Sequence, residues 1–330
     1  MTVEQNEYVA TLPMLLTEVE VLRVERVSPS FVRVELGGAA LAELGPDGPV
    51  HDQRIKLIFP NAAGTLPSFA HADESWWTTW IEIPEHERGS MRTYTIRDIL
   101  GEGSDTRLVV DIVVHESDDA DGHGDGLDGA GNRWALQAAP GQRLVTLAPR
   151  KGHEFGGIEW SPGEASRLLL VGDETAVPAI RGVLRDLPAD ATGAAYLEVP
   201  VDADIQELVA PSGVGVTWLP RNGGARGEEL HAAVLAHLTG ATHTEAIVVT
   251  DDEIDPDLWE TPVHSSSGEE VATATAVPTG DAPYAGLYAW IAGESKVVTG
   301  LRRKLVKDLG LDRRQVAFMG YWREGVSMRS

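Results

Sequence analysis

The sequence predicts an α/β protein with two domains, an antiparallel β-barrel domain followed by a doubly wound α/β domain. Three observations support this fold class. The 330 residues suit two domains of ordinary size. The first half alternates apolar and polar residues in short runs bounded by turn residues, which is typical of antiparallel strands. The second half contains continuous apolar runs separated by helical stretches, which is typical of a parallel sheet covered by helices.

The first domain is expected to cover residues 1–162. Its alternating runs predict strands at 17–27, 31–36, 54–59, 90–97, 107–115 and 143–147. In the third of these runs, the alternation places Arg54, Lys56 and Ile58 on one face of the strand. Residues 132–138 predict a short helix. The Asp- and Gly-rich residues 116–131 predict a surface loop.

The second domain is expected to cover residues 163–330, after a turn around Pro162. Its apolar runs predict strands at 168–171, 193–199, 214–219, 245–250, 287–292 and 315–321. Between them, helices are expected at 175–187, 226–238 and 295–309. A Ser-, Thr- and Ala-rich insert at about 252–286 predicts a second surface loop.

The composition excludes several functions. Acidic residues outnumber basic ones by 51 to 27, and this net charge of −24 argues against nucleic acid or an anionic membrane as a partner. The absence of cysteine excludes disulfides, thiolate metal sites and iron–sulfur clusters, and we expect no metal site. No signal peptide begins the sequence, and no apolar run approaches ~18 residues. We therefore expect a cytoplasmic protein, with a monomer as the working assumption.

The segment Arg92-Thr93-Tyr94-Thr95 brings a cation, a flat ring and hydroxyl groups together on one strand. Arg92 and Tyr94 point to one face of that strand, and Thr95 leaves on the other. Such a group could hold a planar, phosphorylated cofactor, with Arg92 on a phosphate, Tyr94 along the ring and Thr95 near a ring nitrogen. The alternative is an edge strand with an exposed Arg and a half-buried Tyr.

A second candidate site lies where predicted strands of the second half end. Gly172-Asp173-Glu174-Thr175-Ala176 joins a buried strand to a helix, which is where open α/β sheets bind nucleotides. Gly293-Glu294 ends another strand at the same edge, and the glycine would let a ligand approach the backbone. Glu198 favours NADH as the coenzyme and Arg221 favours NADPH, so the sequence does not determine which of the two coenzymes is used. Ordinary strand–helix turns are the alternative.

These motifs together resemble a known family. Arg92-x-Tyr94-Thr95 resembles the flavin signature of ferredoxin-reductase-like enzymes. Three further segments resemble the siderophore-interacting proteins, which are ferric-siderophore reductases: 111–115 with Trp134-Ala135, then 170–180, and 292–295 with 320–323. The resemblance extends from about residue 19 to residue 323. It departs from the family at Gly129-Ala130-Gly131, where Gly-Pro-Ala is usual, and at the acidic insert.

The resemblance implies that residues 1–162 bind FAD and that 163–330 bind NADH or NADPH. The implied FAD contacts are Arg92, Thr93, Tyr94, Thr95, Asp111, His115, Trp134 and Ala135, with Thr95 the residue near the redox atom. The implied NAD(P)H contacts are Gly172, Asp173, Glu174, Thr175, Ala176, Gly293 and Glu294. Lys56, Arg150 and Arg323 would bind the ferric siderophore, although each could instead be a solvent-facing cation.

The implied reaction is the reduction of chelated Fe(III) by NAD(P)H through FAD, which releases the iron. Two rival functions remain open. A general NAD(P)H:flavin oxidoreductase would share every cofactor contact and differ only at the three cations. A siderophore-binding protein without enzymatic activity would carry no flavin.

Overall fold

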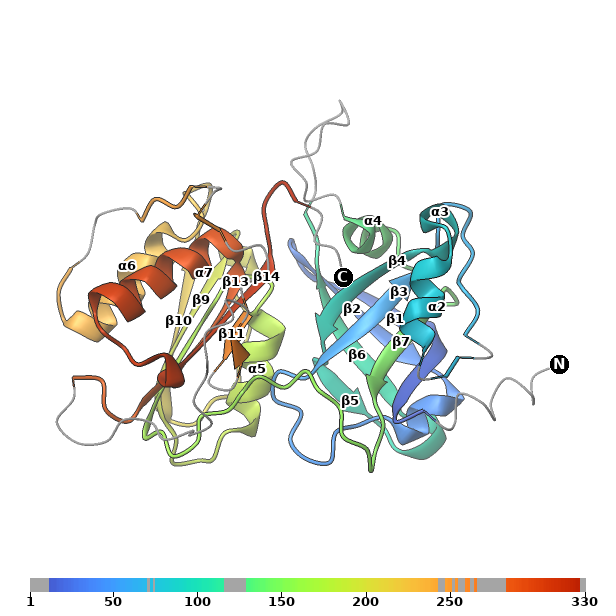
Figure 1. Cartoon of the computed structure of the whole chain (residues 1–330), viewed down its shortest axis with the longest axis horizontal. Coiled ribbons are helices and arrows are strands. Elements are labelled where there is room, and N and C mark those ends of the chain that lie inside the picture. The colour runs from blue at the N-terminus through green and yellow to red at the C-terminus, as the bar shows by residue number, and fades with distance from the viewer. Residues whose placement is uncertain are drawn as a thin grey trace. The chain divides into compact units, whose positions relative to one another are not determined.

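The computed structural model describes residues 12–69, 72–73, 75–115, 129–242, 247–250, 253–254, 259–261, 264–265 and 283–326. The chain forms two compact units, each built around its own sheet, with the division between Ile158 and Glu159 (Figure 1). We call them unit 1 and unit 2. The sequence analysis placed the division after Pro162. Within the described residues, no helix has the length and apolarity needed to cross a bilayer.

Unit 1 is a seven-stranded antiparallel sheet with the order β4-β3-β7-β1-β2-β6-β5. Its strands are β1 Met14–Ser28, β2 Phe31–Gly37, β3 Arg54–Phe59, β4 Ser90–Thr95, β5 Asp98–Leu100, β6 Arg107–Val113 and β7 Arg143–Pro149. The backbone N–H of Arg97, just after β4, donates to Val109 O of β6 at 3.0 Å. The sheet therefore curls back on itself as a half-barrel, which confirms the predicted antiparallel domain.

The helices of unit 1 are short and lie outside the sheet: α2 Trp76–Glu82, α3 Glu85–Arg88 and α4 Ala130–Leu136, with 3₁₀ turns at Ala39–Glu43 and Gly103–Asp105. Inside the half-barrel, Ile55 and Leu57 pack in the main core, while Ile58 packs on the other face with Trp80 of α2. Tyr94 pairs across the strands with Ile55, and Thr95 pairs with Arg54. The predicted alternation along β4 is therefore confirmed.

Unit 2 has a seven-stranded mixed sheet with the order β10-β9-β8-β13-β14-β11-β12. Its strands are β8 Arg167–Gly172, β9 Thr192–Val199, β10 Gly213–Pro220, β11 Trp259–Thr261, β12 His264–Ser265, β13 Leu287–Glu294 and β14 Val316–Trp322. The first five in this order are parallel, and β11 and β12 run antiparallel at the edge. The carboxyl ends of the parallel strands therefore share one edge of the sheet, where nucleotides bind in such folds.

Helices cover both faces of this sheet. α6 Glu228–Thr239 and α7 Ser295–Arg302 pack together on one face, and α5 Val177–Asp186 lies on the other (Figure 1). α7 continues as a π-helical segment at Arg303–Asp308, and 3₁₀ turns occur at Asp202–Asp204 and Arg313–Gln315. Because the interior strands are covered on both sides, their residues are almost all buried. The doubly wound prediction is confirmed.

Two local predictions for unit 2 were wrong. Residues 247–250 form no strand, although 245–250 are apolar enough to predict one; residues 243–246 lie outside the described residues. Part of the predicted loop at 252–286 instead forms the hairpin of β11 and β12. Glu260 of β11 receives two hydrogen bonds from Arg302 of α7, at 2.6 and 3.0 Å. This tertiary ion pair supplies an anchor that the local composition does not reveal. The predicted loop 116–131 lies outside the described residues up to 128.

Candidate functional site

The first candidate site lies on the neighbouring strands β3 and β4 of unit 1. Lys56 pairs with Thr93 in the ladder, and its Nζ donates to Thr93 Oγ1 at 2.7 Å. Burial lowers the pKa of Lys56, and the nearby guanidinium groups of Arg54 and Arg92 lower it further. Arg92 itself is half-buried and projects from the opposite face of β4. The ladder therefore collects three cations in a strongly acidic protein.

Tyr94 belongs to a cluster of aromatic rings with Phe59 and Trp134. Its ring meets Phe59 edge to face at a centroid distance of 6.1 Å, and Phe59 contacts Trp134 of α4 at 5.2 Å. Burial raises the pKa of the Tyr94 hydroxyl, so this side chain stays neutral. Ala135, on α4 itself, is buried in the core of unit 1. The structure thus brings together Tyr94 and Trp134, which are separated by 40 positions and were both predicted as flavin contacts.

Asn132 links α4 to the end of β6 by hydrogen bonds. It was not among the site residues predicted from the sequence. The His115 backbone N–H donates to Asn132 Oδ1 at 2.9 Å, and Asn132 Nδ2 donates to the carbonyl of His115 at 3.1 Å. These reciprocal bonds join the two sides of the acidic insert. They hold His115 beside the helix that carries Trp134. A carboxamide just after a Gly-rich stretch was the only available sequence signal.

Gly131 allows α4 to approach β4. A Cβ atom at this position would lie 2.1 Å from the Tyr94 hydroxyl oxygen, closer than any real contact. Gly131→Ala should therefore displace Tyr94 or α4 and destabilise unit 1 by about 1–3 kcal/mol, despite the better helix propensity of alanine. Gly129→Ala is the matched control, because nothing lies within 4 Å of its Cβ position and its φ of −64° suits any residue. Urea unfolding would measure both; equal stability of the two variants contradicts the expectation.

Two predicted site residues of unit 1 have protein partners instead. Asp111 is 5% exposed, and its two carboxylate oxygens accept hydrogen bonds from Arg33 at 2.7 and 2.9 Å. It also forms an ion pair with Arg97, whose Nε lies 3.3 Å from Oδ2. Arg150 is 6% exposed and contacts the Leu12 carbonyl at 2.5 Å and Glu43 at 3.1 Å. Arg150 is therefore not the solvent-facing cation that was the alternative to siderophore binding, because it is buried between Leu12 and Glu43.

The second candidate site, at the carboxyl edge of the unit 2 sheet, begins with Asp173. This carboxylate is 1% exposed and accepts four hydrogen bonds. One oxygen accepts from the backbone N–H (2.9 Å) and the hydroxyl (2.6 Å) of Thr175. The other accepts from the Glu294 N–H at 2.7 Å and from Trp322 Nε1 at 2.8 Å. Asp173 therefore ties the ends of β8, β13 and β14 together.

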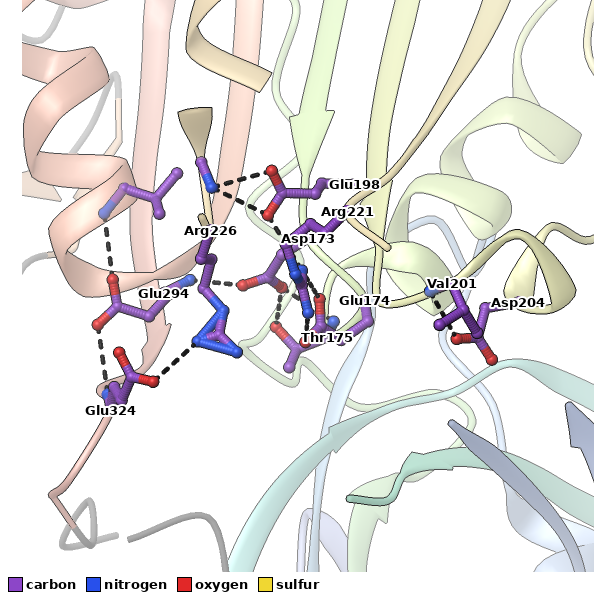
Figure 2. Close-up of polar contacts among 12 residues, drawn as sticks. Asp173, Glu174, Thr175, Glu198, Val201, Asp204, Arg221, Arg226, Glu294 and Glu324 are labelled. Carbon is purple, nitrogen blue, oxygen red and sulfur yellow. Dashed lines mark hydrogen bonds and ion pairs between the residues drawn. The ribbon is translucent and has the colours of Figure 1, made fainter. Parts of the chain in front are cut away.

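Arg221 links two further carboxylates at this edge (Figure 2). It donates to both oxygens of Glu174 at 2.8 and 3.0 Å, and to Glu198 at 3.0 Å. The backbone N–H of Gly227 also donates to Glu198, at 3.0 and 2.9 Å to its two oxygens. Both carboxylates are completely buried. Arg221 and Glu198, considered as alternative coenzyme contacts in the sequence analysis, are therefore partners of each other.

Gly293 and Glu294 also serve the protein itself. A Cβ atom on Gly293 would lie 2.8 Å from the Asp173 carboxylate, and its φ of +150° disfavours other residues. Glu294 caps α7 by accepting from the N–H groups of Lys296 (2.6 Å) and Val297 (3.2 Å), while its other oxygen accepts from Glu324 N–H at 3.3 Å. The close approach predicted for a ligand at Gly293 is thus made by Asp173.

The buried carboxyl groups at this edge of the sheet have shifted pKa values, two of them raised and one lowered. Burial and the neighbouring Glu174 raise the pKa of Asp173 to about 6, and burial raises the pKa of Glu198 to about 7 despite Arg221. Burial would also raise the pKa of Glu174, but the two hydrogen bonds and the charge of Arg221 outweigh it and lower that pKa. Asp173 and Glu198 therefore ionise near neutral pH.

Unit 2 should accordingly lose stability as the pH rises from about 4 to about 7. The folded pKa values of Asp173 and Glu198 lie above the ordinary values near 4, so the folded state binds more protons there. The stabilisation is complete below about pH 4 and is lost above about pH 7, on the order of 2 kcal/mol per group. Glu198→Gln, which cannot ionise, should flatten this dependence in urea unfolding at several pH values. An unchanged slope would contradict the expectation.

Comparisons with known proteins agree with both halves of the chain. Residues 20–153 match the model of the siderophore-interacting FAD-binding domain, and residues 165–325 match that of the siderophore-interacting protein. A solved siderophore utilization protein from T. fusca is 30% identical, covers 97% of each chain and superposes with a TM-score of 0.62. Ferric vibriobactin reductase ViuB of Vibrio cholerae is 28% identical over 97% of this chain and 93% of its own. The NADPH-dependent ferric-chelate reductase of Escherichia coli is 27% identical over 92% of each.

Proposed function

We propose, because the chain belongs to the siderophore-interacting protein family, that it is a cytoplasmic ferric-siderophore reductase that uses NADH or NADPH. The substrate is a ferric siderophore, and the product is Fe(II), which hard anionic oxygen ligands hold less tightly than Fe(III). Bound FAD would supply the redox chemistry that matches a two-electron hydride donor to a one-electron acceptor. The similarity to two ferric-chelate reductases over nearly the full chain supports this reaction.

One observation carries the FAD assignment: α4 packs against β4 so closely that only glycine fits at position 131. The Tyr94 and Trp134 rings both contact Phe59, the His115 backbone is bonded to Asn132 of α4, and Arg92 lies two residues before Tyr94 on β4. A guanidinium beside aromatic side chains suits a flat ring system with a pyrophosphate tail. We assign the phosphates to Arg92, the ring to Tyr94 with Thr95, and the adenine side to His115 and Trp134.

For the remaining predicted site residues, the protein groups that each one contacts decide the role that we assign to it. Asp111 and Arg150 are engaged in unit 1, so we assign them to stabilising the half-barrel. Lys56 keeps its proposed role, because it is half-buried and, among the described residues, its ammonium donates to a neutral hydroxyl group, that of Thr93. Arg323, in unit 2, also keeps its proposed role. Both would attract an anionic chelate in a protein of net charge −24.

An anaerobic absorbance experiment tests the function. The purified protein should be yellow, should bleach with NADH or NADPH, and should regain its colour when a ferric siderophore is added, with Fe(II) trapped by a chromogenic chelator. The gallium(III) complex of the same siderophore is the matched control, because it has the same charge and size but accepts no electron. Reoxidation by oxygen but not by the ferric complex would favour a general flavin oxidoreductase. A colourless protein that takes up no FAD would exclude the reductase.

A further inference from the structure

Two arginines follow β10, and their surroundings differ completely. Arg221 has its guanidinium saturated by Glu174 and Glu198, as described above. Among the residues that the structure describes, Arg226 donates one hydrogen bond, which runs 3.4 Å from its NH1 to Glu324, whose side chain is 51% exposed. Its Nε atom is buried and has no hydrogen-bond partner among the described residues. A charged group with unused donors at the carboxyl edge of a parallel sheet indicates a ligand contact.

Arg226 is nevertheless held in place by its surroundings. Its guanidinium lies over the Trp322 ring, 4.5 Å from the ring centre, which is the geometry of a cation–π contact. The Trp322 ring is oriented in turn by its Nε1 bond to Asp173 at 2.8 Å. The next residue, Gly227, is fixed through its backbone N–H to Glu198. A stacked, pre-oriented guanidinium loses little further entropy when it binds a phosphate bidentately.

The acidic charge of this edge makes a cation such as Arg226 important for any anion that binds there. The described residues at the strand ends include Asp173, Glu174, Glu198, Glu294 and Glu324 (Figure 2). Arg221 is offset by two of these carboxylates. The hydroxyl of Thr175, predicted to meet a phosphate, already donates to Asp173 at 2.6 Å. Without the positive charge of Arg226, a dinucleotide would face an acidic surface with few donors.

We propose that Arg226 holds a phosphate group of the nicotinamide dinucleotide, with Trp322 as its platform. Glu324 is the internal competitor that the phosphate displaces from NH1. This inference rests on the proposed function and deepens it by assigning the coenzyme contact to Arg226, not to Arg221. The same chemistry suits the pyrophosphate, present in both coenzymes, and the 2′-phosphate, present only in NADPH.

The test is direct binding of NAD⁺ and NADP⁺ to the FAD-loaded protein by calorimetry. Arg226→Gln should weaken binding by about tenfold to a hundredfold, as expected for the loss of a charge-assisted bond. Glu324→Gln should tighten it several-fold, because the competing carboxylate is gone. Arg185→Gln is the matched control, since this arginine pairs with the adjacent Asp186 at 2.7 Å on α5 and should leave binding unchanged.

The pattern of losses distinguishes the outcomes. An equal loss for both coenzymes in Arg226→Gln assigns the pyrophosphate, and a loss for NADP⁺ alone assigns the 2′-phosphate; either supports the proposal. Unchanged binding in Arg226→Gln overturns the proposal. The proposal is also overturned if Arg226→Gln and Glu324→Gln both weaken binding and both lower thermal stability equally, because the two residues would then form a structural ion pair. Failure of the unmodified protein to bind either coenzyme would overturn the proposed coenzyme use as well.

Discussion

Replacing Arg221 with methionine is expected to destabilise unit 2 by about 3–5 kcal/mol. The substitution leaves the carboxylates of Glu174 and Glu198 completely buried without their cation. Methionine retains most of the apolar volume, so the loss reflects charge and not a cavity. Because Glu174 follows β8 and Glu198 lies on β9, the effect should be concentrated at these two strands of the sheet.

Amide hydrogen exchange of β8 and β9 would measure this loss, since it reports opening of unit 2 separately from unit 1. Arg185→Met is the matched control, because its ion pair lies on the surface of α5 and should contribute within about 0.5 kcal/mol. The triple variant Arg221→Met, Glu174→Met, Glu198→Met should recover much of the stability, because no charge is left buried. A loss below about 1 kcal/mol in Arg221→Met would show that water reaches the two carboxylates.

Replacing Arg92 with glutamine is expected to weaken FAD binding by about tenfold to a hundredfold or more, while unit 1 stays folded. The physical reason is the loss of a charge-assisted, bidentate contact to a phosphate, about 1.5–3 kcal/mol. Arg92 is half-buried beside Tyr94 in the ladder of β3 and β4, so its charge acts with little screening. Arg92→Lys should recover part of the affinity, because a lysine keeps the charge but not the planar fork.

Titration of the apoprotein with FAD, followed by quenching of flavin fluorescence, would measure these affinities. Arg143→Gln provides the control, since this arginine lies on β7 of the same sheet and forms an exposed ion pair with Glu18 at 2.9 Å. Far-ultraviolet circular dichroism would show that each variant is folded. If Arg92→Gln bound FAD as tightly as the unmodified protein, the phosphates would have to lie elsewhere on unit 1.

The sequence predicted the larger features well because they depend on local patterns. Alternation along residues 54–59 and 90–95 determines which side chains share a face of the sheet, and the structure places them so. The uninterrupted apolar run at 168–171 predicted a strand buried on both faces. The same local criteria misassigned residues 247–250, where apolar composition is not accompanied by a neighbouring strand.

The candidate sites were predictable only as positions in the chain. The segments around Tyr94, Trp134, Asp173 and Glu294 were selected correctly as the ends of strands and the starts of helices. The partners of their side chains were not, because Arg221 reaches residues 23 and 47 positions away through the order of the strands. Asn132 and Arg226 were missed because neither belongs to a recognisable motif.

The sequence by itself determined two domains, their fold classes and the face on which each strand residue lies, since the side-chain periodicity of a strand is a local property. Only the tertiary structure decided which charges bind one another. A buried carboxylate needs a partner within about 3 Å, and strands β8, β9, β10 and β14 supply those partners from distant parts of the chain. Arg221 is thereby enclosed, whereas the buried Nε of Arg226 has no hydrogen-bond partner among the described residues.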